Sequence, residues 1–491
     1  MGDLPEADFR RLLHEVADWI ADYRAGIETR RVSPEHEPNA IINSLPGVPP
    51  EEAVPLEEIL RDFDRVIMPG IVHWGHPSFL GYFATTTNAP GIIGEMLAAA
   101  LNVSAMTWQT SPAATELEFV VLDWIRQMLG LPTDFSGIVY DTASVAVLHA
   151  LAAAREDLGF DVRREGLAGR ADIPQLTLYA SDQAHSSLEK AAITLGLGEA
   201  NVRRIASDAE YKMDTDALRR AITADLHAGH RPLAVVATVG TTSATSVDPV
   251  NTIADVCRER RIWLHVDAAY GGAMALLEEG RHVMRGVERA DSVVFNPHKW
   301  LFVPLDFSAL YVRRPETLSR VFSLVPEYLR GDAERTGEGI PNYMDYGIQL
   351  GRRFRALKAW CVIRAFGREG LAARIREACR LARLVASWIE VDERFEILAP
   401  VEMGVVCFRA RALNSKVETP AVMLDDLNEQ LLARINATGA AYMTHTRLHG
   451  RLALRIAVGN LLTTERHLAN VWKLICDQLS TMDAQTKASQ G

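Results

Sequence analysis

Residues 292–301 read SVVFNPHKWL, and in them a short run of β-forming residues leads directly to a lysine, Lys299. A lysine at the carboxyl end of a buried strand, beside proline, histidine and tryptophan, loses much of its hydration. Desolvation lowers the pKa of the amine and favours imine formation with a carbonyl compound. An equally acceptable reading of this segment alone is a lysine whose stem covers apolar surface while its amine reaches water.

Similar β-forming runs recur along the middle of the chain, with helical stretches between most of them. They lie at residues 137–140, 176–180, 233–239, 262–267 and 308–312. Strands that alternate with helices predict an α/β fold with a mainly parallel sheet and helices on both faces. Ligands of such sheets bind beyond the carboxyl ends of the strands, so functional residues are expected just after these runs.

Asp267 lies in the run IWLHVDAAY, residues 262–270, and is a second candidate at a strand end. A carboxylate in an apolar setting needs a cation, and the protonated pyridine nitrogen of a cofactor would supply one. Such a pair would keep the ring able to accept the electrons released when a bond to a substrate α-carbon breaks. Capping of a following helix is the alternative role for Asp267.

Residues 137–151, GIVYDTASVAVLHAL, predict a strand, a small polar turn and an apolar helix. The backbone N–H groups from Thr142 to Ser144 would then face a ligand above the sheet, and helix amino termini of this kind bind phosphate. Taken alone, both residues are better explained as helix caps.

Two further strand-end segments carry polar candidates. His185, in YASDQAHSSL at residues 179–188, would lie against a pyridine ring and within reach of a substrate carboxylate. A lone histidine in such a loop is more often structural. The same two readings apply to the threonines of ATVGTTS, which are Thr238, Thr241 and Thr242.

Composition and charge narrow the class of protein. The 491 residues are 48% hydrophobic and 23% charged, as in ordinary globular proteins, and the formal charge of -11 disfavours nucleic acid and membrane partners. No apolar run is long enough to span a bilayer and the amino terminus is acidic, so we expect a cytoplasmic protein. Five scattered cysteines without a CxxC spacing predict reduced thiols and no metal site.

The chain is expected to have three parts and a tail. Residues 1–85 predict a helical arm, interrupted by a proline-rich loop, with little of its own to fold around. Residues 86–385 contain the predicted sheet, and residues 386–480 alternate short strands and helices, as a small α+β domain does. Residues 481–491 predict a disordered tail.

From about Phe9 to Leu479 the sequence resembles the group II pyridoxal phosphate decarboxylases, and most closely the aromatic-L-amino-acid decarboxylases. Six motifs carry the resemblance, and chance matches to all six in this order are not credible. They are VIMPGIVHWGHPSF (66–79), TSPAATELE (110–118), SDQAHSS (181–187), HVDAAY (265–270), NPHKW (296–300) and LGRRFRALK (350–358).

The resemblance implies the type I fold of pyridoxal phosphate enzymes, with a large mainly parallel sheet, and a homodimer. In that dimer the arm wraps the partner and the active sites lie at the interface. Lys299 is implied to hold pyridoxal 5'-phosphate as a Schiff base, Asp267 to bind the pyridine nitrogen and His185 to stack on the ring. The remaining implied cofactor residues are Ala143, Ser144 and Asn296 at the phosphate, Thr242 beside the ring, and His298 before the lysine.

Residues 324–339, LVPEYLRGDAERTGEG, are polar, contain glycine and are long enough to form a mobile lid. Tyr328 matches the family's loop tyrosine, which protonates the α-carbon after carbon dioxide leaves. Relatives that form aromatic aldehydes carry phenylalanine there, so the resemblance favours an amine product.

The implied substrate residues form an aromatic wall suited to a flat ring, although core packing is the ordinary role of such residues. Compared with the animal dopa enzymes, Met106 and Leu305 replace phenylalanines and Ala84 replaces a proline, which implies a differently shaped pocket. Glycine at position 351 accompanies indole substrates in plant members of the family. The resemblance therefore favours tryptophan as the substrate. The wall residues are Trp74, Tyr82, Phe83 and Thr85.

Three other functions are compatible with the sequence. An aldehyde synthase or a decarboxylase of acidic or aliphatic amino acids would use the same cofactor, and product analysis separates them. A non-catalytic binding or scaffold protein on the same fold is the alternative from a different class.

Overall fold

The computed structural model describes residues 3–83, 86–324, 340–411 and 420–490, with side chains through residue 485 in the last range. Two compact units are present. The smaller comprises the described parts of residues 1–84, 388–396 and 408–491, and the larger comprises those of residues 85–387 and 397–407. No described helix is both long enough and apolar enough to cross a membrane.

The larger unit contains a seven-stranded sheet in the order β1-β7-β6-β5-β4-β2-β3. Only β7 runs antiparallel to its neighbours, β1 and β6. The predicted α/β fold with a mainly parallel sheet is therefore confirmed. The strands are β1 (Ser136–Tyr140), β2 (Leu176–Ser181), β3 (Val202–Ile205), β4 (Arg231–Thr238), β5 (Trp263–Asp267), β6 (Ser292–Phe295) and β7 (Ser308–Val312).

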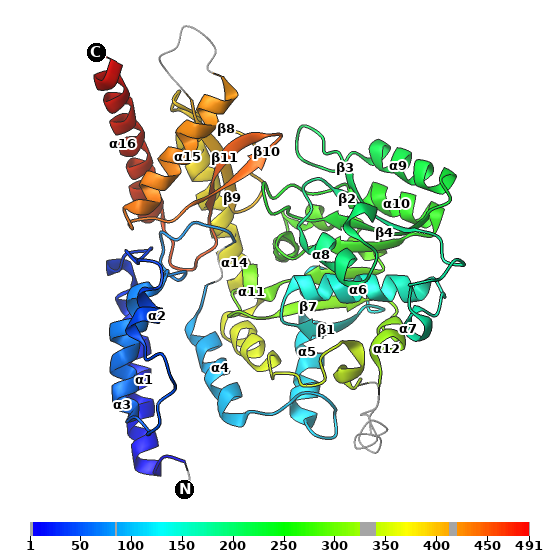
Figure 1. Cartoon of the computed structure of the whole chain (residues 1–491), viewed down its shortest axis with the longest axis horizontal. Coiled ribbons are helices and arrows are strands. Elements are labelled where there is room, and N and C mark those ends of the chain that lie inside the picture. The colour runs from blue at the N-terminus through cyan, green and yellow to red at the C-terminus, as the bar shows by residue number, and fades with distance from the viewer. Residues whose placement is uncertain (1–2, 84–85, 325–339, 412–419, 491) are drawn as a thin grey trace. The chain divides into compact units, whose positions relative to one another are not determined.

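Helices alternate with these strands, and α6 lies across the sheet, in contact with β1 and β4 to β7 (Figure 1). The buried side of α6 is rich in alanine, for example Ala146, Ala150 and Ala153, whose small side chains let the helix lie close to the strands. The helices of this unit are α4 (Ala89–Leu101), α5 (Pro112–Leu129), α6 (Ala143–Asp157), α7 (Val162–Glu165), α8 (Ser187–Thr194), α9 (Thr215–His227), α10 (Val250–Arg260), α11 (Pro297–Trp300), α12 (Glu316–Phe322) and most of α14 (Ala356–Glu390).

The smaller unit joins the amino-terminal residues to the carboxyl-terminal part of the chain. Leu80 donates its N–H to the carbonyl of Tyr442 at 2.8 Å, and Ala457 donates to the carbonyl of Leu80 at 2.9 Å. The four-stranded sheet belongs to this unit except for Ile397 and residues 405–407, and it has the order β10-β11-β9-β8. Its strands are β8 (Phe395–Ile397), β9 (Val405–Ala410), β10 (Thr444–Leu448) and β11 (Arg451–Ala457), and the helices are α1 (Glu6–Ala25), α2 (Ala40–Ser44), α3 (Leu56–Asp62), α15 (Ala421–Ala437) and α16 (Glu465–Gln490).

The carboxyl-terminal residues differ from the prediction. Helix α16 continues to Gln490, so the disordered tail expected from residue 481 is wrong as a statement of local structure. Residues 481–490 contain neither proline nor glycine, and Met482 is buried, which together allow the helix to continue.

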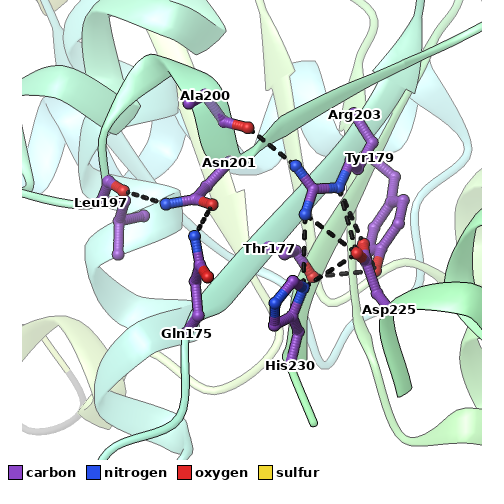
Figure 2. Close-up of polar contacts among 9 residues, drawn as sticks. All are labelled: Gln175, Thr177, Tyr179, Leu197, Ala200, Asn201, Arg203, Asp225 and His230. Atoms are coloured by element: carbon purple, nitrogen blue, oxygen red, sulfur yellow. Dashed lines mark hydrogen bonds and ion pairs between the residues drawn. The ribbon is translucent and has the colours of Figure 1, made fainter. Parts of the chain in front are cut away.

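A buried ion cluster fastens the edge strand β3 to the rest of the sheet (Figure 2). Asp225 of α9 accepts hydrogen bonds from the Arg203 guanidinium at 2.9 and 3.0 Å and from the Tyr179 hydroxyl at 2.7 Å, and His230 Nδ1 lies 3.0 Å away. Burial alone would raise the pKa of Asp225, but the hydrogen bonds from Arg203, Tyr179 and His230 outweigh it and lower the pKa to about 2. The cluster therefore ties together β2, β3 and α9.

We expect Asp225→Asn to lower the free energy of unfolding by about 2 kcal/mol, because Arg203 would lose its charged acceptor. Since the folded-state pKa is depressed, the stabilisation is complete above the ordinary value of 3.8 and declines as the pH falls toward about 2. Urea unfolding at neutral pH and near about pH 3 measures the difference, which should shrink in acid. Asp172→Asn, which removes an exposed pair with Arg170, is the matched control and should change stability much less.

Candidate active site

The carboxyl ends of the parallel strands lie along one side of the large sheet. The functional residues predicted from the sequence follow these strand ends. Lys299 lies in the short helix α11, directly after β6, and Asp267 is the last residue of β5. His185 follows β2 in the turn that precedes α8. The register pairs Asp267 with Thr238 of β4 and with Val294 of β6, which fixes the height of the carboxylate within the sheet.

Lys299, Asp267 and His185 are close enough for their charges to interact. Burial lowers the pKa of Lys299, while the negative charge of Asp267 acts in the opposite direction. The surrounding chain partly desolvates the His185 ring, although the residue is exposed by its accessible surface, and this desolvation lowers its pKa. The charge of Asp267 raises the pKa, and the charge of Lys299 lowers it further. The structure thus brings one carboxylate, one amine and one imidazole together, and the amine and imidazole are both biased toward their neutral forms.

The amino terminus of α6 offers unused hydrogen-bond donors at the same edge. Thr142 occupies the N-cap position without a side-chain capping bond, and Ala146 is the first residue to donate back along the helix, to the Thr142 carbonyl at 3.1 Å. The N–H groups of Ala143 and Ser144 have no acceptor one helical turn earlier, and both residues are half-buried. This arrangement suits a phosphate group.

Asn296 and His298 belong to a buried network that holds the turn carrying Lys299. His298 Nδ1 accepts the N–H of Phe307 at 2.9 Å, and its Nε2 lies 3.2 Å from the Asn296 amide nitrogen. The Ser308 hydroxyl donates to the Asn296 side-chain oxygen at 2.7 Å. Burial, followed by the charge of Lys299, lowers the pKa of His298 to about 3, so this imidazole stays neutral and links α11 to β7.

Beneath the turn, Trp300 stacks on Tyr270 with ring centroids 4.5 Å apart. Both rings are buried, and they join the segment after β5 to the segment after β6. The turn that carries Lys299 therefore has an aromatic support on its inner side.

The loops after β4 and β5 touch backbone to backbone, and glycine permits this contact. Gly240 has φ +87°, and a Cβ there would lie 2.9 Å from the Gly271 nitrogen. A Cβ on Gly271 would lie 2.5 Å from the Val239 carbonyl oxygen. Thr242 is exposed in the first of these loops.

Thr238 Oγ1 is buried without a hydrogen-bond partner among the described residues, and its strand neighbour Asp267 accepts the Ala269 N–H at 3.0 Å through Oδ1. No described residue donates a hydrogen bond to Asp267 Oδ2. The carboxylate of Asp267 and the helix N–H groups at the start of α6 lie at the same end of the sheet as Lys299, and together they fit a cofactor with a basic ring nitrogen and a phosphate.

The residues predicted to contact the substrate ring are divided between the two units. In the larger unit Met106 is half-buried and Leu305 is 63% exposed. In the smaller unit Trp74 stacks on Tyr82 at 5.3 Å, and the Arg455 guanidinium lies 5.5 Å from the ring centre of Phe83. Thr85 and Tyr328 lie outside the described residues.

Asp248 is a buried carboxylate that holds the backbone at the end of β4, and it was not identified from the sequence. Its oxygens accept the N–H groups of Thr238 and Met213, each at 2.8 Å. Burial raises its pKa to about 7 although both hydrogen bonds lower it. The only signal in the sequence was an aspartate before proline, in SVDP, which is also an ordinary turn pattern.

Comparison with known proteins gives matches over nearly the whole chain. The family model described as "Pyridoxal-dependent decarboxylase conserved domain" matches residues 38–411. Tryptophan decarboxylase 1 of Oryza sativa subsp. japonica is 40% identical over 481 residues, which cover 95% of this chain and 93% of the relative. Phenylacetaldehyde synthase of a Rosa hybrid cultivar is 38% identical over 485 residues, or 96% and 94% of the two chains. The crystal structure of Oryza sativa TDC with PLP and tryptamine has a TM-score of 0.93 at 39% identity, covering 98% of this chain and 99% of that one.

We expect Asp267→Asn to lower the pKa of His185 further, because the negative charge that opposes the effect of burial is removed. Titration of the His185 ring signals by NMR in cofactor-free protein measures this pKa, with the signals assigned by a His185→Gln variant. Asp182→Asn, in the same loop, is the control that should leave the titration unchanged. An unaltered His185 titration in Asp267→Asn would contradict the proximity of the two groups.

Proposed function

The chain belongs to the family of pyridoxal-dependent decarboxylases, a family of carboxy-lyases that use pyridoxal phosphate, and on that basis we propose the following reaction. The enzyme converts an aromatic L-amino acid to the aromatic amine and carbon dioxide, with tryptophan preferred over dopa, tyrosine and phenylalanine. The observation that carries the decarboxylation is the 40% identity to a tryptophan decarboxylase over 95% of the chain, and the preference for tryptophan rests on the glycine at position 351.

When bound, pyridoxal phosphate supplies a ring that takes up the electron pair released as the bond from the α-carbon to the carboxylate breaks. Lys299 would hold the cofactor through its amine, whose lowered pKa leaves more of it uncharged and able to bond to a carbonyl carbon. Asp267 would pair with the ring nitrogen, and the N–H groups of Ala143 and Ser144 would bind the phosphate. Asn296 and His298 would position the lysine turn, since their side chains contact each other and β7.

His185 is suited to hold the substrate carboxylate. Its Nδ1 accepts the Ser187 N–H at 3.1 Å, so the neutral ring carries its proton on Nε2 and can donate it to an anion. The exposed ring can also lie against the cofactor, with Thr242 on a neighbouring loop. A hydrogen bond from His185 Nε2 would hold the substrate carboxylate in one orientation while the bond between the α-carbon and the carboxylate breaks.

The substrate ring would contact Trp74, Tyr82, Phe83, Thr85, Met106 and Leu305. The flat stack of Trp74 on Tyr82, with an interplanar angle of 6°, is an aromatic surface of the kind that an indole would extend. Tyr328 would deliver a proton to the α-carbon after carbon dioxide leaves, which completes the amine.

A homodimer with active sites at the interface is part of the same proposal. Helix α4 exposes Ile93, Leu97 and Leu101 by about half of their surface, at 54%, 49% and 59%. Apolar side chains exposed in a row along one helix favour burial against another chain, and a second copy is the partner that the family resemblance suggests.

An aldehyde synthase is the second candidate, because phenylacetaldehyde synthase is nearly as similar to the chain as the tryptophan decarboxylase. Tyrosine at position 328 favours the amine product.

We expect the enzyme loaded with pyridoxal phosphate to release carbon dioxide and amine with the highest kcat/KM from tryptophan, lower values from dopa, tyrosine and phenylalanine, and none from glutamate. Lys299→Ala should lose both turnover and the visible absorbance of bound cofactor, whereas Lys473→Ala, an exposed lysine in the smaller unit, should keep both. A preference for glutamate, or activity in Lys299→Ala, would overturn the proposal.

We expect Tyr328→Phe to shift the product from amine to aldehyde in air, because phenylalanine has no hydroxyl proton to give to the α-carbon. The unprotonated carbon can then lose two electrons to dioxygen, which becomes hydrogen peroxide, and water releases the nitrogen as ammonia. Chromatography of the products formed from tryptophan gives the ratio. Tyr346→Phe, at a described tyrosine with no proposed role, is the control and should still yield amine. If Tyr328→Phe forms amine as the unaltered enzyme does, the proton has another source.

A further inference from the structure

A second cleft in the larger unit lies away from the candidate active site. It has a volume of about 330 Å³ and is lined by residues 127–131, which form the end of α5 and the turn after it, by residues between Ala275 and Glu288, and by Arg368 of α14. These lining segments lead into the amino ends of β1 and β6, whereas Lys299 and Asp267 lie at the carboxyl ends of β6 and β5. The cleft is therefore at the opposite edge of the sheet.

Three arginines line this cleft, two from the single turn at residues 281–285 and one from α14, and none has a carboxylate partner among the described residues. Arg281, Arg285 and Arg368 are all exposed and form no side-chain hydrogen bond or ion pair within that part of the chain. Glu288 is the single acidic lining residue, and its Oε2 already accepts the Gly286 N–H at 2.9 Å. The lining carries an excess of positive charge in a chain whose formal charge is -11.

A second arginine-lined cleft of the larger unit provides a comparison, because most of its guanidinium groups are paired with carboxylates. There Arg289 pairs with Asp255 at 2.7 Å, and Arg314 pairs with Asp157 at 2.9 Å and with Asp291 at 3.1 Å. Arg313, in the same lining, pairs with Asp134. Arg261, an exposed residue of the second lining, also has no carboxylate partner among the described residues, but the first cleft gathers three such arginines.

The floor of the first cleft is apolar. Side chains that are nearly completely buried lie under the arginines, among them Leu129, Leu131, Met284 and Val287, each less than 8% exposed. A ligand that fills the cleft would thus meet guanidinium groups at the rim and hydrocarbon below. A guanidinium presents paired donors that match phosphate oxygens, and an apolar floor rewards a hydrocarbon body on the same molecule.

We propose that this cleft binds a small organic phosphate monoester, with the phosphate held by Arg281, Arg285 and Arg368 and the organic part against the apolar floor. The alternative is structural: the arginines would stabilise the carboxyl end of α5, whose last carbonyls carry partial negative charge. The two roles differ in what the removal of the arginines changes.

The test is calorimetric titration of the pyridoxal phosphate-loaded enzyme, in which the cofactor's own phosphate site is filled, with phenyl phosphate and with inorganic phosphate at constant ionic strength. We expect phenyl phosphate to bind more tightly than inorganic phosphate, and binding of both to weaken as salt is raised. Arg281→Ala/Arg285→Ala should weaken phenyl phosphate binding at least about tenfold without changing the thermal midpoint. Arg260→Ala, an exposed arginine outside the lining, is the matched control and should bind as the unaltered enzyme does.

Three outcomes would overturn the proposal: equal binding by the double variant and the unaltered enzyme, equal affinity for the two phosphates, or a lowered thermal midpoint with unchanged binding. The last result would assign the arginines to α5. If the double variant does not fold, the single substitution Arg368→Gln, on a different helix, tests the same prediction and should also weaken phenyl phosphate binding.

Discussion

The parallel register of β4, β5 and β6 is the constraint on which the candidate active site depends. The ladder continues past the strands, since Val239 donates to the Asp267 carbonyl at 2.8 Å and Ala268 donates to the Val294 carbonyl at 2.9 Å. Each loop consequently leaves the sheet from a fixed point. A slip of one residue would turn Asp267 to the other face of the sheet and away from Lys299.

The charged groups of the candidate site are not paired one to one, unlike the buried ion pair of Arg352 and Glu118. Arg352 and Glu118 form a buried pair at 2.6 Å, and two backbone carbonyls, of Ala105 and Val139, accept two further N–H groups of Arg352. At the candidate site one carboxylate, Asp267, faces both an amine and an imidazole. Burial disfavours the charged forms of both bases, which suits groups that must exchange protons or form bonds near neutral pH.

The sequence predicts those parts of the fold that depend on local patterns within a few neighbouring residues. A β-forming run followed by a polar turn is a local pattern, and six such runs of the large sheet were located within about two residues. The missed strand β3 reads VRRI, and its two arginines hide the β-forming pattern. Arg203 pairs with Asp225 of α9 and Arg204 with Glu189 of α8, and both partners are distant in the sequence. The partners of Asp248 are likewise distant in sequence, so its role could be read only from the folded chain. The same reason hid the association of the amino-terminal residues with β11, which rests on main-chain hydrogen bonds of Leu80 that carry no sequence pattern.

The contact between Gly240 and Gly271 has a consequence for how this enzyme can diverge or be redesigned. The two loops are in contact through backbone atoms, so their conformations depend on each other. A side chain added to either glycine would collide with the other loop and displace it. Substitutions that reshape the surroundings of Thr242 will be tolerated only in combination with compatible changes after β5. A library that varies one loop at a time will recover few folded members, whereas diversity introduced at the smaller unit's Trp74 and Tyr82 escapes that coupling.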